Sequence, residues 1–417
     1  MVVKRRGQAP PRQEQGSGLR AKHAWNIGQQ WYVDALNGSD TTGNGSSGNP
    51  WQTLQKAADY LRTTATWPLA QDVAVNIRPT AAYKAPSTEQ ATLWTDFTSA
   101  ARAPAADRYL IWRVDPAYPG RARIVNPDGA SGNKIGVILG TSALNSYQVF
   151  SGLDLDGERV RKGSGGGGVL AFYLSGTAAN SNTRVEILNT KIHGFRASLG
   201  AGNTAQGVFA DDGSSYLLFD RVEVYDIGAA DDTIDNSGHG LYLQSHHNQV
   251  TNAVFHDNPN GYGIQLYNGG TVSMNGTIVA DVTMNNNYAS GILLHGDASN
   301  VRLKNLITTN HTSRGNSSWG IEFYPFPTGA ASGSVLDHVL YHHDYGNRSH
   351  TPAGWTFSNE QTADPRYANA AAGDLHLLAG SPALGYTDTV FSPALDYDGL
   401  TRPAGAEDAG AFERVGG

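Results

Sequence analysis

The chain has 417 residues, 50 of them glycine, no cysteine, and a formal net charge of −7 at neutral pH. Without cysteine there can be no disulfide, thiolate metal site or cysteine nucleophile. Glycine is far too frequent for a helical protein, and it shows no collagen-like period. The mild charge gives no sign of a nucleic-acid partner, and no run of about 20 apolar residues offers a membrane span.

Residues 1–28 are predicted to be a disordered basic tail. Their Lys and Arg residues lie among Pro, Gln and Gly, without periodic apolar positions. These basic residues are Lys4, Arg5, Arg6, Arg12, Arg20 and Lys22. The Arg5-Arg6 pair is not followed by an apolar stretch of about 7–15 residues, so it does not predict a twin-arginine export signal.

Residues 29–135 are predicted to form an N-terminal cap and the first irregular coils of a stacked structure. Trp31–Asp34 has the pattern of a strand, and Val73–Ile77 has that of the next one. Between them, apolar residues recur at helical spacing from Leu54 to Leu61, shortly after Pro50, which predicts a short helix. A cap is needed because the first coil would otherwise expose an open strand edge and an open core.

Residues 136–360 are predicted to form regular coils, because a short sequence motif centred on a glycine, here called the glycine phrase, recurs in them. Gly240, Gly263, Gly291 and Gly320 stand at equivalent places, 23, 28 and 29 residues apart. After each glycine, apolar and variable residues alternate, which is the pattern of a strand with one buried face. A repeat of this length with one short strand in each unit predicts a solenoid.

A second strand pattern alternates with the glycine phrase. In it, apolar residues surround a polar pair, as at Ile187–Ile192, Val250–Phe255 and Leu303–Thr308. The polar pair predicts a bend, since Asn and Asp tolerate left-handed backbone and bond their own main chain. Each coil is therefore predicted to hold at least two strands joined by bends.

The two alternating strand types resemble the right-handed parallel β-helix of the pectate-lyase-like superfamily. The strand, glycine-rich loop and helix of the first part resemble the N-terminal cap of many such proteins. Residues 361–417, with phrases such as Gly373–Leu377 and Asp408–Glu413, resemble the C-terminal closing segment of bacterial secreted β-helix proteins. The resemblance implies an all-β fold, a single-stranded right-handed parallel β-helix (solenoid) with a short N-terminal capping helix, in an extracellular or cell-surface protein.

Side chains after each coil glycine alternate between the core and the outside of the solenoid. The residues predicted to face inward are Leu241, Leu243, Ile264, Leu266, Ile292, Leu294, Ile321 and Phe323. Those predicted to face outward form one column of Phe209, Tyr242, Gln265, Leu293 and Glu322, and a second of Asp211, Gln244, Tyr267, His295 and Tyr324. Tyrosines beside hydrogen-bonding groups suit sugar rings, which have apolar faces edged by hydroxyls. The alternative is that such residues merely decorate the solenoid.

The site is predicted at the coil of Gly240, where an imidazole, a phenol and carboxylates converge. His239 and Tyr242 are the predicted acid/base pair, with Asp211 and Glu322 as further catalytic carboxylates. The two carboxylates lie four coil steps apart, roughly 19 Å, so they cannot act as each other's partner in hydrolysis. Contacts to the substrate are expected from Gln244, Gln265, Tyr267, His295 and Tyr324.

Four aspartates form the densest acidic group near this coil. Asp211, Asp212, Asp231 and Asp232 could hold Ca²⁺ through carboxylate oxygens, or could simply form turns. Apart from this possible calcium ion, no cofactor is expected.

Three functions fit these patterns. The first is a carbohydrate-active enzyme that cleaves a polysaccharide on the outward face, by β-elimination as a lyase or by hydrolysis. The second is a non-catalytic glycan-binding or adhesin-type β-helix, and the third is a trimeric virion tail-spike depolymerase. We expect a polysaccharide or oligosaccharide as the partner, no nucleic acid, no membrane span, and a monomer rather than a trimer.

Overall fold

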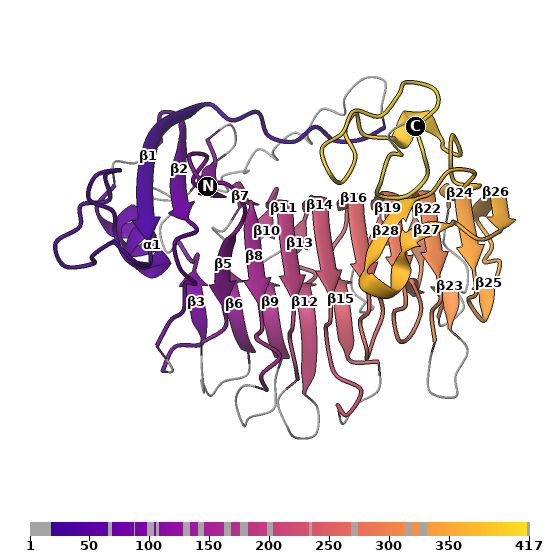
Figure 1. Ribbon diagram of the computed structural model, residues 1–417, viewed down its shortest axis with the longest axis horizontal. Coiled ribbons are helices and arrows are strands. Elements are labelled where there is room, and N and C mark those ends of the chain that lie inside the picture. The colour runs from indigo at the N-terminus through magenta and orange to yellow at the C-terminus, as the bar shows by residue number, and fades with distance from the viewer. Residues whose placement is uncertain are drawn as a thin grey trace, which may run out of the picture.

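The computed structural model describes residues 18–65, 69–86, 88–97, 104–105, 108–127, 134–140, 146–161, 168–175, 182–197, 203–232, 236–267, 274–312, 318–324 and 332–414. Within these ranges the chain is nearly all β, with parallel strands stacked coil upon coil along one long axis (Figure 1). Residues 1–17 of the predicted tail lie outside the described residues. No helix in the described ranges is both long and apolar enough to cross a membrane.

The larger sheet contains thirteen parallel strands among the described residues, and it follows the chain from the first coil to the last. Its main path consists of β1 (Ile27–Asp34), β2 (Asp72–Arg78), β4 (Leu110–Val114), β7 (Gln148–Ser151), β11 (Glu186–His193), β14 (Leu218–Tyr225), β16 (Gln249–His256), β19 (Ile278–Asn285), β22 (Arg302–Thr309), β24 (Ser334–His342) and β26 (Trp355–Thr362). Beside this path, β5 (Ala122–Val125) pairs with β8 (Leu153–Asp156), which pairs with β11.

The smaller sheet has nine parallel strands in the described ranges and contains the glycine phrases. Its strands are β3 (Ala91–Trp94), β6 (Lys134–Gly140), β9 (Gly168–Leu174), β12 (Thr204–Ala210), β15 (Gly238–Leu243), β17 (Ile264–Tyr267), β20 (Ile292–His295), β23 (Trp319–Phe323) and β25 (Gly346–Arg348). Short pairs complete the structure: β10 (Asn182–Thr183) with β13 (Ser214–Ser215), β18 (Met274–Asn275) with β21 (Ala298–Ser299), and antiparallel β27 (Tyr367–Asn369) with β28 (Asp374–Leu377). Two 3₁₀ turns, η2 (Ala370–Ala372) and η3 (Thr389–Phe391), lie near the C-terminus.

The predicted capping helix is present as α1 (Leu54–Thr63). The side chain of Thr53 accepts a hydrogen bond from the backbone N–H of Lys56 and so caps the helix start. The apolar positions of α1 face the core of the first coil, as their spacing predicts, and Trp51 packs beside them.

The predicted bends are also present, in the middle of the long strands of the larger sheet. Asn189, Asn252, Asp281 and Asn305 all have positive φ angles, between 46° and 55°, one in each of four coils. A left-handed residue in mid-strand turns the chain while the strand stays paired on both sides. The polar pairs of the sequence thus mark the corner of each coil.

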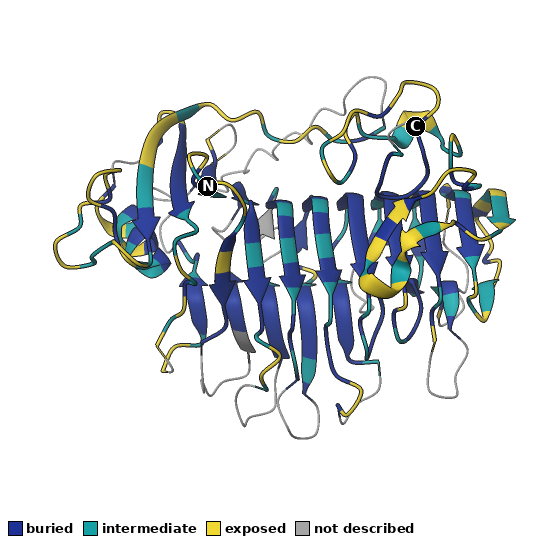
Figure 2. Ribbon diagram, viewed as in Figure 1, coloured by how far each residue is buried: buried dark blue, intermediate teal, exposed yellow. Residues whose placement is uncertain are grey.

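The core lies between the two sheets and follows the predicted alternation. All eight predicted inward residues are at most 1% exposed. The strands in Figure 2 are accordingly coloured as buried over most of their length. The in/out register read from the glycine phrases is therefore confirmed.

Residues 364–414, here called the C-terminal segment, fold back over the outer face of the larger sheet instead of continuing the coils (Figure 1). Two apolar clusters attach the segment: Leu377, Ala383 and Ala409 pack on Ile307 and Leu340, and Leu375, Ala411 and Phe412 pack on Val254. The face of the larger sheet is thereby covered from β16 to β24.

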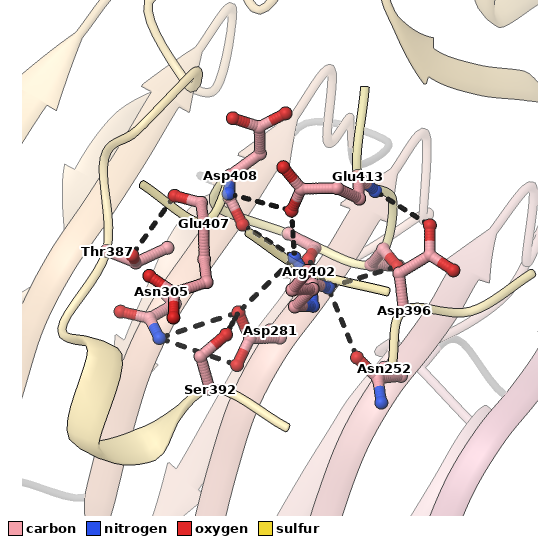
Figure 3. A network of polar contacts seen from close by, with 12 residues as sticks. Asn252, Asp281, Asn305, Thr387, Ser392, Asp396, Arg402, Glu407, Asp408 and Glu413 are labelled. Carbon is pink, nitrogen blue, oxygen red and sulfur yellow. Dashed lines mark hydrogen bonds and ion pairs between the residues drawn. The ribbon is translucent and has the colours of Figure 1, made fainter. Parts of the chain in front are cut away.

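A buried arginine completes this attachment at the corner of the coils (Figure 3). The Arg402 side chain donates hydrogen bonds to the carbonyl oxygens of Asp408 and Gly410, each at 2.8 Å, and to Oδ1 of Asn252 at 3.1 Å. It also lies 3.2 Å from a carboxylate oxygen of Glu413 and 3.9 Å from one of Asp281. One guanidinium therefore holds the C-terminal segment to β16 and β19.

Residues 18–26, which the sequence predicts to be part of a disordered tail, instead lie along the larger sheet. We call them the N-terminal strap. The backbone N–H of Arg20 donates to Oε1 of Gln249 on β16 at 2.7 Å, and Nζ of Lys22 lies 2.8 Å from Asp220 on β14. Polar groups on the sheet thus bind the strap, although residues such as Lys22 remain exposed to solvent.

The strap also connects parts of the chain that are far apart in sequence. Nε2 of His23 lies 2.8 Å from a carboxylate oxygen of Asp72 at the start of β2, and the His23 N–H donates to Glu186 on β11. At the other end, Gly18 sits against the ring of Phe391, so close that an added Cβ would collide with it. The strap therefore reaches from the first coils to the C-terminal segment.

Candidate functional site

The outer face of the smaller sheet carries the predicted columns of side chains. Strand pairing places Phe209, Tyr242, Gln265, Leu293 and Glu322 in one column, as predicted from the sequence. Tyr267 and His295 pair in the second column. The face is less open than predicted, because Gln265 and Leu293 are buried, Leu293 beneath Tyr262 and Ala289.

Six aromatic rings form a continuous row across this face, which we call the aromatic ladder. The row consists of Tyr173, Phe209, Tyr242, Tyr267, His295 and Tyr324, and the centroids of successive rings lie 4.3 to 5.8 Å apart. It changes from the first column to the second between Tyr242 and Tyr267, whose rings meet edge to face. The ladder ends at Tyr324, which is 57% exposed.

Glu322 is the carboxylate beside the exposed end of the ladder. Its side chain accepts a hydrogen bond from the Ser290 hydroxyl at 2.6 Å, one coil away. Burial raises the pKa of Glu322 above the usual range of a carboxylic acid. The register places His295 on the neighbouring strand, two residues beyond Leu293, the partner of Glu322. Burial lowers the pKa of His295, which favours its neutral form.

His239 does not have the open position that the acid/base hypothesis requires. It is 5% exposed, and its ring stacks on Tyr262 of the next coil with centroids 5.4 Å apart. Its Nδ1 accepts the backbone N–H of Tyr262 at 3.4 Å. Burial lowers the pKa of His239 to about 3, so the imidazole stays neutral. The ring does contact Tyr242 edge to face, at 5.4 Å.

The remaining predicted contact residues differ in how accessible they are. Nε2 of Gln244 donates to the phenol oxygen of Tyr242 at 3.1 Å, and both are half-buried. Tyr267 and His295 are also half-buried, and Gln265 is buried. The predicted contact residues thus form a graded surface that opens toward the Glu322 end.

The four aspartates proposed for calcium have other partners. Asp211 accepts a hydrogen bond from the Ser175 hydroxyl and one from the backbone N–H of Gly213, as a turn-forming aspartate does. Asp231 and Asp232 both pair with the guanidinium of Arg161.

Asp212 is exposed. In the part of the chain that the structure describes, no three His, Cys, Asp or Glu side chains are grouped to hold a metal ion. Calcium binding by the four aspartates stays a prediction.

Sequence reasoning missed the two residues that control the environment of the candidate acid and of His239. Ser290 bonds Glu322, and Tyr262 covers His239. Each stands one position before the glycine of its phrase, at Gly291 and Gly263. The residues one position before each glycine thus form a third column, and the same repeat could have predicted it.

Comparison with known proteins agrees with the fold described above. Residues 167–315 match the family model for a right handed beta helix region. The fold of the chain is a right-handed parallel β-helix. This β-helix superposes on pectate lyase Pel9A with a TM-score of 0.55 and 13% identity, covering 94% of this chain and 98% of that one.

A structure titled glycoside hydrolase superposes equally well. It gives a TM-score of 0.55 at 8% identity, covering 84% of this chain and 99% of that one. At such identities the likeness establishes the fold alone. No curated protein matches this β-helix in sequence.

Proposed function

We propose that this protein is a carbohydrate-active enzyme that cleaves a polysaccharide bound along the aromatic ladder. The observation that carries the proposal is the position of Glu322, a carboxyl group with a raised pKa beside the exposed end of that ladder. The ladder crosses six coils, five steps of about 4.8 Å, which gives room for several sugar residues. Aromatic faces and nearby hydrogen-bonding groups together suit sugar rings.

Glu322 is suited to donate a proton to the leaving oxygen of a glycosidic bond. A carboxyl group whose pKa is raised by burial is the usual general acid for this step. His295, on the next strand, is neutral and can accept a proton. In hydrolysis it would activate water, and in β-elimination it would remove the proton beside a uronate carboxylate. Both reactions use the same two residues, so the products distinguish them.

The test is a panel of neutral and acidic polysaccharides, followed by both unsaturated-uronate absorbance and reducing ends. A gain in absorbance identifies a lyase, and reducing ends alone identify a hydrolase. On the active substrate, we expect Glu322→Gln and His295→Gln each to lower kcat by about 10²-fold while leaving Tm unchanged. Glu89→Gln, which removes an exposed carboxylate elsewhere, is the matched control and should retain full activity.

Two outcomes would contradict the proposal. Full activity of Glu322→Gln would exclude that residue as the acid. Binding of a polysaccharide without any cleavage across the panel would instead favour a glycan-binding β-helix.

A further inference from the structure

A pocket lies away from the aromatic ladder, between the larger sheet and the C-terminal segment. Its volume is about 530 Å³, within the range of small-molecule sites. Strands of the larger sheet and the segment before β5 form its floor, and the C-terminal segment forms its wall. The lining residues are Arg121, Asn189, Lys191, Arg221, Glu223, Ala372, Gly373, Asp374, His376, Tyr397, Asp398 and Phe412.

The floor of this pocket is rich in cations that carboxylates do not fully pair. The guanidinium of Arg121 donates to the carbonyl and amide oxygens of Asn189, at 3.1 and 2.8 Å, both neutral acceptors. Nε of Arg221 is buried without a hydrogen bond inside the described ranges, and its nearest carboxylate oxygen, on Asp220, lies 3.4 Å away. A guanidinium that lines a pocket without a full set of acceptors favours an anionic ligand.

One carboxylate and one phenol meet at the centre of the pocket. Glu223 lies 2.6 Å from Nζ of Lys191 and accepts a hydrogen bond from the Tyr397 hydroxyl at 2.7 Å. Burial acts to raise the pKa of Glu223, but hydrogen bonds from His256 and Lys191 lower it to about 2. Glu223 is therefore ionised and can accept hydrogen bonds from hydroxyl groups.

The wall combines rings with a charged imidazole. The His376 ring lies between the carboxylates of Asp374 and Asp398, at 2.6 and 2.7 Å, and it packs on Phe412 with centroids 4.2 Å apart. Phe412 in turn meets Tyr397 edge to face at 5.3 Å. The pocket thus offers cations on one side and aromatic faces on the other.

From the incompletely paired guanidinium groups, the cavity and the aromatic wall together, we infer that this pocket binds an acidic sugar. The carboxylate of the sugar would lie between Arg221 and Lys191, the first with its fork and the second as a point charge. Tyr397 and Phe412 would face the apolar side of the ring, and Glu223 would accept from its hydroxyls. This binding site is separate from the aromatic ladder and does not depend on the proposed cleavage.

The charges of the lining agree with this ligand. Three permanent cations and a protonated His376 face three carboxylates, so the pocket has a net positive charge. A bound monoanion would bring the pocket to neutrality. A neutral sugar would leave the Arg121 guanidinium with only the neutral acceptors of Asn189.

Calorimetric titration of the full chain with glucuronate tests the inference, with glucose as the neutral match and inorganic sulfate as the simple anion. We expect glucuronate to bind at least about tenfold more tightly than glucose or sulfate. Arg221→Gln should weaken glucuronate binding by at least about tenfold, because it removes a charge-assisted hydrogen bond to the carboxylate. Arg159→Gln removes the same charge from a side chain that is 71% exposed and lies outside the pocket. This control and Glu322→Gln should both leave the affinity unchanged.

Several results would overturn the inference. These are an absence of glucuronate binding, an unchanged affinity in Arg221→Gln, and an equal loss in Arg159→Gln. Sulfate binding as tight as that of glucuronate would show a simple anion site instead. If Arg221→Gln does not fold, Lys191→Gln takes its place with the same expected loss. Loss of binding in Glu322→Gln would move the bound sugar to the aromatic ladder and contradict this site.

Discussion

Arg402→Met should release the C-terminal segment from the larger sheet. The substitution keeps an unbranched side chain but removes the guanidinium that bonds Asp408, Gly410 and Asn252. Breaking a buried charge pair by removing one partner costs about 3–5 kcal/mol. At about 1.4 kcal/mol per tenfold, local opening of the segment should become roughly 10²- to 10⁴-fold more frequent. Hydrogen exchange of residues 402–413 measures this opening directly.

The loss in this variant should depend on pH. Burial raises the pKa values of Asp281 and Glu413 to about 7, so both carboxylates take up a proton readily on mild acidification. Without the cation, which lowers both pKa values, these carboxylates are neutral acids at pH 5, whereas at pH 8 their ionisation is opposed by burial with no cation beside them. The protection factors should therefore fall less at pH 5 than at pH 8. Arg414→Met is the control in the same segment, and equal protection in both variants would refute the role of Arg402.

Three further predictions test the fold, the charge of the pocket wall and the metal hypothesis. Ile264→Asp should unfold the coils, since it buries an unpaired carboxylate in a position that is 0% exposed, whereas Ile264→Val should melt within a few degrees of the parent. The hydrogen bond with Asp398 raises the pKa of His376 to about 9. The protonated imidazole therefore contributes its full stabilisation below pH 6.5, and this stabilisation is lost as the pH rises to about 9. The Tm of the parent should therefore decline between pH 6.5 and pH 9, and this decline should be absent in His376→Gln. An identical decline in both proteins would contradict the raised pKa of His376. A chelator should leave Tm unchanged, because Arg161 already neutralises Asp232, and a lowered Tm would restore the calcium hypothesis.

Local patterns predicted the coils well because the coils are built from local rules. The alternation after each glycine gave the buried set that includes Ile264 and Ile292, and the polar pairs gave the left-handed corners at Asn252 and Asn305. Each of these features depends on residues within a few positions in the chain. They could therefore be predicted without any knowledge of long-range contacts.

The parts that the sequence did not predict depend on partners far away in the chain. His239 is of a residue type that often acts in catalysis, but the ring that covers it belongs to the next coil. Asp232 pairs with Arg161, 71 residues earlier, and Arg20 bonds Gln249, 229 residues later. Sequence patterns are read over short stretches of the chain, and no such stretch contains both members of these pairs. For this reason the sequence predicted neither the pairing of Asp231 and Asp232 with Arg161 nor the contacts of residues 18–26 with the larger sheet.

The N-terminal strap changes how this molecule should unfold. In an ordinary solenoid each coil touches only its neighbours, so the ends can fray independently and stability is a sum of local terms. Here the strap is bound to β2, β11, β14 and β16, and its Gly18 packs on Phe391 of the C-terminal segment, which is itself bound to the later coils. The two ends of the chain are thereby linked across the outside of the stack. Fraying at either end must break contacts with distant coils, which favours a single cooperative transition, and removal of residues 1–26 should separate it into more than one step.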